Sequence, residues 1–149
     1  MPDLSLVDAG RALATGARAL ERVLGDMTLA QFRVLSVVAS SPERASRIAE
    51  RADMSRPSLS GLLDGLASRG WVERRVVAGD RRGVRLEVTS DGHAALRRAQ
   101  AAVSEAMAAI LVDVPCDERD GVRRALVVLA RAFDERATSS RAAQEAPTS

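Results

Sequence analysis

The sequence predicts a mainly α-helical protein with one small two-stranded β-hairpin. Hydrophobic residues make up 46% of its 149 residues but aromatic residues only 2%, so the core must be built from aliphatic side chains, which favours packed helices. Apolar residues recur at helical spacing along most of the chain. The exceptions are two alternating or β-branched runs, Trp71 to Val77 and Val84 to Thr89, joined by a glycine-containing loop. A chain of this length is expected to form one domain.

Two helices are expected in the N-terminal part of the chain. The first begins near Leu6 and ends near Gly25-Asp26. Thr28 is a suitable N-cap for the second, which Ser40-Ser41-Pro42 stops. The apolar stripe of the first helix consists of Leu6, Leu13, Ala17, Leu20 and Leu24.

A third and a fourth helix are expected with a tight turn between them. The third fits residues 45–51, and the fourth follows Ala52-Asp53-Met54-Ser55 and ends at Gly70, a residue that suits the end of a helix. Ser55 is a good N-cap, but Pro57 disfavours a helical conformation of Arg56. The fourth helix can therefore begin at either position.

Two further helices are expected after the hairpin. Ser90 or Asp91 begins a long helix that Pro115 ends. Residues 137–149 carry no apolar stripe and are expected to form a flexible tail. The stripe of the last helix consists of Val122, Leu126, Leu129 and Phe133.

Positive charge is concentrated in the middle of the chain. Residues 44–85 hold ten of the 22 basic residues but only five of the 20 acidic ones. All the basic residues are arginines, whose planar guanidinium group suits phosphates and guanine edges. The middle of the chain is therefore the part expected to meet a polyanion.

The order helix, turn, helix, hairpin over residues 45–89 is that of a winged helix-turn-helix. In this arrangement the N-terminal residues of the second helix reach base edges in the major groove of DNA. Arg56 lies there and can pair bidentately with a guanine or grip a phosphate. The residues expected to face DNA are Ser55, Arg56, Pro57, Ser58, Ser60, Arg74, Arg75, Asp80, Arg81, Arg82 and Arg85.

The hairpin loop places one carboxylate among several arginines. A hairpin tip is narrow enough to enter the minor groove, whose negative potential attracts arginine. Asp80 can hold the guanidinium of Arg82 by a charge-assisted hydrogen bond and so set its direction before DNA arrives. Arg82 is therefore the expected minor-groove residue, and Arg74, Arg75, Arg81 and Arg85 are expected to serve phosphates or intramolecular pairs.

The run SRPSLSGLLDGLASRGWVERRVVAGDRRGVRLEVTSDG (residues 55–92) resembles the core of the MarR family of winged-helix transcriptional regulators. The shared features are the Asp-x-Arg of the wing at Asp80 and Arg82 and the Thr-x-x-Gly at Thr89 and Gly92. The resemblance includes TLAQFRVLSVVA before this run and, in helix order, covers roughly residues 5–136. It implies a homodimer with interlocking terminal helices, a palindromic operator and release of DNA by a small phenolic or otherwise anionic ligand.

One MarR-like domain over residues 1–136 follows from this resemblance, with a DNA-binding lobe at 28–89 and dimerisation helices at 4–25 and 90–136. The terminal apolar stripes can be intramolecular core. However, a winged helix closes its own small core, so long flanking helices need another apolar surface, and a second copy supplies it. The expected dimer residues are Leu6, Leu13, Leu20, Leu126, Leu129 and Phe133, and the candidate ligand-pocket residues are Phe32 and Arg33.

Other site types find little support in the sequence. His93 is the only histidine, no spacing pairs a nucleophile with a base, and no Gly-rich phosphate loop occurs, so neither an enzyme nor a metal or cofactor is expected. Some family members sense peroxide through a cysteine near the N-terminus. Cys116 follows Pro115 instead, beside acidic residues, and is expected to be inert.

The predicted function is that of a homodimeric regulator, most simply a repressor, that binds double-stranded DNA sequence-specifically. The alternative is a winged-helix interaction module in which Arg56 and the wing bind an acidic protein. A lone cysteine, the absence of an apolar run approaching 18 residues, and early acidic residues favour a soluble cytoplasmic protein without a membrane partner.

Overall fold

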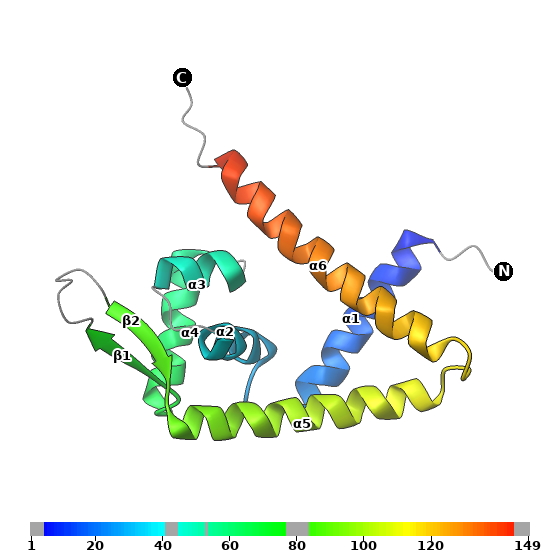
Figure 1. Cartoon of the computed structure of the whole chain (residues 1–149), viewed down its shortest axis with the longest axis horizontal. Coiled ribbons are helices and arrows are strands. Elements are labelled where there is room, and N and C mark those ends of the chain that lie inside the picture. Colours follow the sequence, from blue (N-terminus) through cyan, green and yellow to red (C-terminus); the bar gives the residue numbers. More distant parts are fainter. Residues whose placement is uncertain (1–4, 41–44, 53, 77–83, 145–149) are drawn as a thin grey trace.

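The computed structural model describes residues 5–40, 45–52, 54–76 and 84–144. Its helices and one antiparallel hairpin confirm the predicted fold class, a mainly helical winged helix-turn-helix (Figure 1). The elements in chain order are α1 (Leu6–Val23), α2 (Leu29–Ser40), α3 (Ala45–Ala52), α4 (Arg56–Ser68), β1 (Val72–Val76), β2 (Val84–Val88), α5 (Ser90–Val112) and α6 (Arg119–Gln144).

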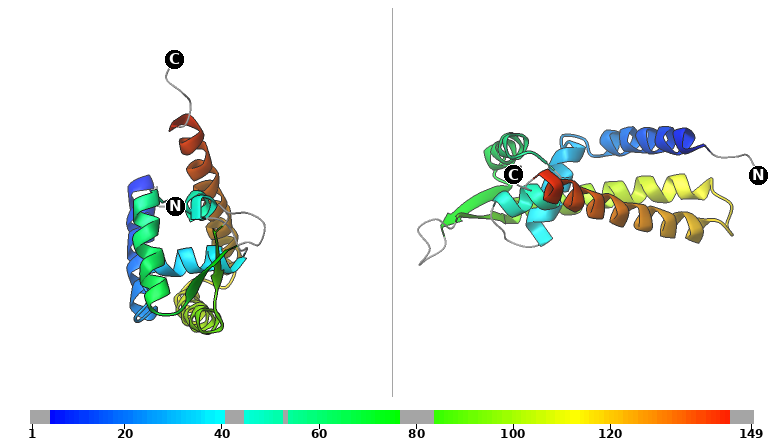
Figure 2. Two further views of the ribbon diagram at one scale, coloured as in Figure 1. Left: turned by 90° about the vertical axis from the view of Figure 1, so that its left-hand side faces the viewer. Right: turned by 90° about the horizontal axis from the view of Figure 1, so that it is seen from above.

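The helix α5 joins two differently built parts of the molecule. At its N-terminal end, α2, α3, α4 and the hairpin gather into a compact unit, which we call the lobe (Figure 1). Beyond the lobe, α1 packs on α5, and α6 runs from the far end of α5 back toward the lobe, where it contacts α3; we call α1 and α6 the flanking helices (Figure 2). In the described part of the chain, no helix is both long enough and apolar enough to cross a membrane.

The core of the lobe is aliphatic, as the composition predicts. Its most deeply buried side chains come from three helices and include Leu35 of α2, Ile48 of α3 and Leu66 of α4. Leu86 of β2 and Leu96 of α5 are buried in the same cluster. Each such side chain contributes about 1.5–3 kcal/mol through removal from water. The lobe therefore closes its own core without the flanking helices.

Side-chain caps fix where the lobe helices begin. The Thr28 hydroxyl accepts a hydrogen bond from the Gln31 amide at 3.1 Å, and the Gln31 side chain accepts one from the Thr28 amide at 3.0 Å. Ser55 caps α4 from an extended backbone, with φ −66° and ψ 151°. Arg56 is consequently the first helical residue, and Pro57 falls in the first turn, where its missing N–H costs nothing.

The register of the hairpin places four charged residues of the two strands on one face. Glu73 pairs with Glu87 and Arg75 with Arg85, so two carboxylates and two guanidinium groups share that face. The opposite face carries Arg74, which pairs with Leu86, together with the valines of both strands. Trp71 and Thr89, which the sequence placed in the strands, lie one residue outside them.

The strands, α4 and α5 meet at a tight junction. The Thr89 hydroxyl caps α5 by accepting from the Gly92 amide at 3.0 Å and donates to the Gly70 carbonyl oxygen at 2.6 Å. Gly70 has φ 71°, a conformation that glycine adopts freely. Trp71 is 9% exposed and belongs to the core cluster at the base of the wing. A Cβ atom on Gly92 would overlap the Trp71 carbonyl oxygen, so α5 can pass this close only with glycine there.

The flanking helices keep apolar side chains in solvent. The helix α1 contains no buried residue, and Leu6 is 92% exposed. The helix α6 runs to Gln144, so helix also covers residues 137–144, where a flexible tail was expected. The physical reason is that Ala, Arg and Gln favour helix even without an apolar stripe.

Candidate nucleic-acid interface

The N-terminal half of α4 presents its polar residues to solvent, as predicted. All five residues expected to face DNA there are exposed, whereas Leu59 and Leu63 of the same helix are buried in the core. Met54 is half-buried and packs against the core at the turn before α4. The exposed residues are Ser55, Arg56, Pro57, Ser58 and Ser60.

A shallow hollow of about 270 Å³ lies between α3, α4 and β1. Arg56 and Arg74 line it beside an apolar floor that includes Leu59 and Leu63. The Arg74 guanidinium is tied to α4, because its Nη2 lies 3.2 Å from Oδ1 of Asp64. The sequence left phosphate contact and intramolecular pairing open for Arg74, and the structure places it in a pair.

Arg75 is also paired within the chain. Its guanidinium lies 2.8 Å from a Glu73 carboxylate oxygen and 3.1 Å from one of Glu87. The hydrogen bond to Glu73, with the charges of Glu73 and Glu87, raises the pKa of Arg75 above its ordinary value. Arg85, opposite on β2, is exposed and has no ion-pair partner within the described chain. Arg85 is thus the cation of the described strands that is available to an external anion.

The wing tip falls outside the described residues. Asp80, Arg81 and Arg82 belong to the stretch 77–83, so the carboxylate brace between Asp80 and Arg82 stays a prediction.

The six residues predicted to form a dimer interface all lie on the flanking helices. Leu13 and Leu126 are 40% and 39% exposed, and Phe133 is 56% exposed. Leu20 and Leu129 are half-buried, and Leu6 is almost fully exposed. Part of each stripe therefore stays uncovered by the described chain.

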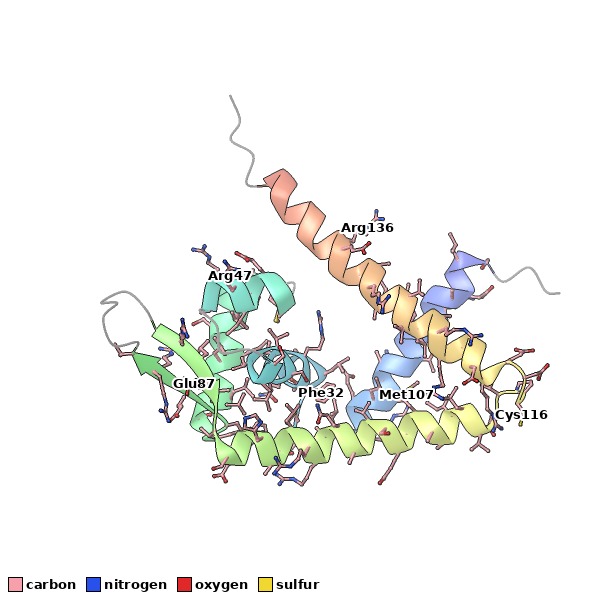
Figure 3. All side chains as sticks on the ribbon, viewed as in Figure 1. Phe32, Arg47, Glu87, Met107, Cys116 and Arg136 are labelled. Carbon is pink, nitrogen blue, oxygen red and sulfur yellow. The ribbon has the colours of Figure 1, made fainter. Side chains whose placement is uncertain are left out.

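The predicted ligand-pocket residues lie on α2. Phe32 is half-buried against the lobe core, and Figure 3 shows it on the side of α2 toward α5. The Arg33 guanidinium donates to the Ala52 carbonyl oxygen at 3.0 Å, which ties α2 to the end of α3. Cys116 is exposed in the turn between α5 and α6, far from the lobe (Figure 3). Within the described ranges, no group of three potential metal ligands is found.

The roles of two residues near this surface were not predicted from the sequence. Asp64 holds Arg74, and Arg69 links the end of α4 to the turn before α2 through Asp26, at 3.0 Å. The Arg69 guanidinium also stacks 4.8 Å from the centre of the Trp71 ring. Because Arg69 and Trp71 are only two residues apart, the sequence gives a weak indication of the stacking. Asp26 is distant in the sequence, so nothing near Arg69 predicts that ion pair.

Comparison with known proteins places this geometry in a family. A model of the MarR family matches residues 25–83. The solved structure of the transcriptional repressor CouR, bound to a 23-mer DNA duplex, matches with a TM-score of 0.73 and 30% identity, covering 85% of this chain and 92% of CouR. The chain belongs to the MarR family.

Two curated repressors are also similar to this MarR-family chain. The HTH-type transcriptional repressor YetL of Bacillus subtilis is 27% identical over 93 residues, or 60% of this chain and 56% of YetL. The homoprotocatechuate degradative operon repressor of Escherichia coli is 34% identical over 82 residues, or 54% of this chain and 55% of that protein. The matched part of the chain thus spans little more than half the length of these curated relatives.

The MarR-family model falls on the lobe rather than on the flanking helices. Residues 25–83 include α2, α3, α4 and β1, and therefore the exposed half of α4. The similarity to CouR reaches further, because it covers 85% of this chain.

Proposed function

We propose that this protein is a transcriptional regulator, most simply a repressor, that binds double-stranded DNA sequence-specifically as a homodimer. The observation that carries the proposal is the exposed N-terminal half of α4, with Arg56 unpaired among the described residues, beside a basic hairpin. Short helices of this kind enter the major groove with their N-terminal residues against base edges. The likeness to CouR, solved with DNA, supports the same interpretation.

The hairpin is assigned to the flanking minor groove. Arg85 remains available for phosphate, whereas Arg74 and Arg75 hold the wing to α4 and to itself. In the proposal, Arg82 enters the minor groove under the guidance of Asp80, and Arg81 contacts the backbone.

Dimerisation is proposed through the flanking helices. Leu6, Leu126 and Phe133 are large apolar side chains that water covers in the single chain. A second copy that removes them from water would set two α4 helices about 34 Å apart, which is one turn of DNA and fits an inverted repeat.

Release of DNA by a small phenolic or anionic ligand completes the proposal. Membership of the MarR family supports it, and Phe32 and Arg33 are its candidate residues. A ligand that displaces Arg33 from Ala52 would loosen the link between α2 and α3.

The direct test measures binding of the protein to DNA from upstream of its own gene and of neighbouring genes. Gel shift or fluorescence anisotropy gives the affinity at several salt concentrations. We expect sequence-specific binding whose affinity falls with salt, because guanidinium groups displace counterions from phosphates. Arg82→Ala should weaken operator binding by about 1–3 kcal/mol with little loss of thermal stability.

Equal affinity of the purified protein for every duplex would count against the proposal. Retention of a protein with an acidic surface, together with weak and sequence-blind DNA binding, would favour the interaction module instead.

A further inference from the structure

Three polar side chains form a stripe along the exposed face of α4. Arg56, Ser60 and Asp64 follow one another at intervals of four residues and are all exposed. Residues at this spacing lie one above the other on a helix. Leu59, Leu63 and Leu66 occupy the buried side of the same helix. The stripe is therefore the surface that α4 offers to a partner.

Within the residues that the structure describes, Arg56 carries the one unpaired charge on this stripe. The Asp64 carboxylate is paired with Arg74 at 3.2 Å, and Ser60 is neutral. Arg56 makes no hydrogen bond or ion pair with any part of the chain that the structure describes. The other arginine next to α4, Arg69, is committed to Asp26 and Trp71 at the far end of the helix.

The start of α4 leaves little room for a phosphate on its backbone amides. The Ser58 amide donates to Oγ of Ser55 at 3.3 Å, and the Leu59 amide donates to the Ser55 carbonyl oxygen at 2.9 Å. Pro57 has no amide hydrogen. The hydroxyl of Ser55 also donates to that of Ser58 at 2.8 Å. A phosphate at the Ser58 or Leu59 amide would have to displace these internal bonds, so the exposed guanidinium of Arg56 is the group that an anion or a base meets first.

We propose that Arg56 reads the operator by binding a guanine edge in the major groove, and is the residue of α4 that sets base specificity. This inference rests on the proposed function. The planar guanidinium donates two parallel hydrogen bonds to O6 and N7 of guanine, an acceptor pair that no other base presents there. The small side chain of Ser60 and the open space at Gly61 allow α4 to approach the bases closely.

Arg85, on β2 of the same lobe, gives a matched comparison. It is exposed and unpaired within the described ranges like Arg56, but it lies on β2 opposite Arg75 rather than on the groove-facing helix. Its role is to contact phosphate, which carries charge but no sequence information. Removal of Arg85 should therefore lower affinity for all sequences alike.

Selection of bound duplexes from a random pool tests the assignment even while the operator sequence is undetermined. The wild-type protein should enrich a repeated half-site with one invariant guanine. Arg56→Ala should lose the preference at that position alone and keep the others. Arg56→Lys keeps the charge but not the planar pair of donors, so it should bind DNA while tolerating other bases at that position.

Affinity measurements on the selected site give the size of the effect. Replacing the invariant guanine by adenine should weaken wild-type binding about 5- to 150-fold, the equivalent of the 1–3 kcal/mol expected for one bidentate pair. The same replacement should leave the affinity of Arg56→Ala unchanged. Replacement of the guanine by 7-deazaguanine, which lacks the N7 acceptor, should likewise weaken binding of the wild type but not of Arg56→Ala. Arg85→Ala should stay as sensitive to the guanine as the wild type.

Two failures can be told apart. If the wild type enriches a site but Arg56→Ala enriches the same one with uniformly lower affinity, Arg56 grips phosphate and this inference is wrong, while the proposed function stands. If the wild type enriches no site, the proposed function fails. Thermal unfolding of each variant at the wild-type temperature confirms that the exposed substitution leaves the lobe folded.

Discussion

The lobe and the flanking helices are built from the same kind of apolar helical stripe, yet only the lobe buries it. Leu35 and Ile48 are fully buried, whereas Leu6 is 92% and Phe133 56% exposed. The lobe brings together helices that cross one another, a hairpin and the start of α5, so each apolar face meets another within the chain. The flanking helices also have neighbours, since α1 packs on α5 and α2 and α6 contacts α3, but these contacts leave Leu6 and Phe133 in solvent (Figure 2).

Helical periodicity therefore predicts an apolar face but not what covers it. A winged helix is complete as a single chain, and its stability should not depend on protein concentration. The stripes on α1 and α6 become stabilising only when a second surface removes them from water. Substitutions in the two regions should therefore act on different equilibria.

The largest effect is expected at the junction of the lobe with α5. A Cβ atom in Gly92→Ala would overlap the Trp71 carbonyl oxygen, which itself accepts a hydrogen bond from the Thr89 amide. Because backbone cannot move aside as a flexible side chain can, we expect a loss of about 4 kcal/mol or more in the free energy of unfolding, measured by urea denaturation. Gly121→Ala in α6, where nothing lies within 4 Å, is the control and should be neutral or slightly stabilising. Equal stability of the two variants would show that α5 can shift at Gly92.

A cavity in the lobe core comes next. Leu35→Ala removes a side chain with no exposed surface, so unfolding should become easier by about 2–5 kcal/mol. The loss should be the same at low and high protein concentration, because the core of the lobe lies within one chain. A loss that grew on dilution would mean that the lobe itself relies on a second copy.

The flanking helices should respond in the opposite way. Phe133→Asp places a charge on the predicted dimer stripe and removes about 1.5–3 kcal/mol of apolar burial per subunit from association, with little effect on the isolated chain. Sedimentation equilibrium measures the dimer dissociation constant. Val128→Asp is the control, because Val128 is similarly exposed, at 64%, on a different face of α6. If Val128→Asp dissociates the protein and Phe133→Asp does not, the other face of α6 forms the interface.

The same contrast explains what the sequence could predict. The order of the elements, the buried face of α4 and the exposure of Arg56 all follow from short-range spacing, and each agrees with the structure. The partners of Arg74 and Arg75 do not, because pairing with Glu87 requires the hairpin register and pairing with Asp64 requires the packing of β1 on α4. Spacing also left the start of α4 open, and the extended backbone of Ser55 decides it.

The smallest effect is expected from the long-range pair that the sequence did not predict. Asp26→Asn removes the ion pair with Arg69, and Arg69→Ala removes both the pair and the stacking on Trp71. The Asp26 side chain is 81% exposed, so solvent and salt screen the pair, and each substitution should cost no more than about 1 kcal/mol in urea denaturation. Arg69→Lys keeps the charge but loses the planar stacking. If Arg69→Lys has the same free energy of unfolding as the wild type in both low and high salt, the stacking on Trp71 contributes nothing to stability. If Arg69→Lys is instead as unstable as Arg69→Ala, the stacking rather than the ion pair stabilises the contact between the end of α4 and the base of the wing.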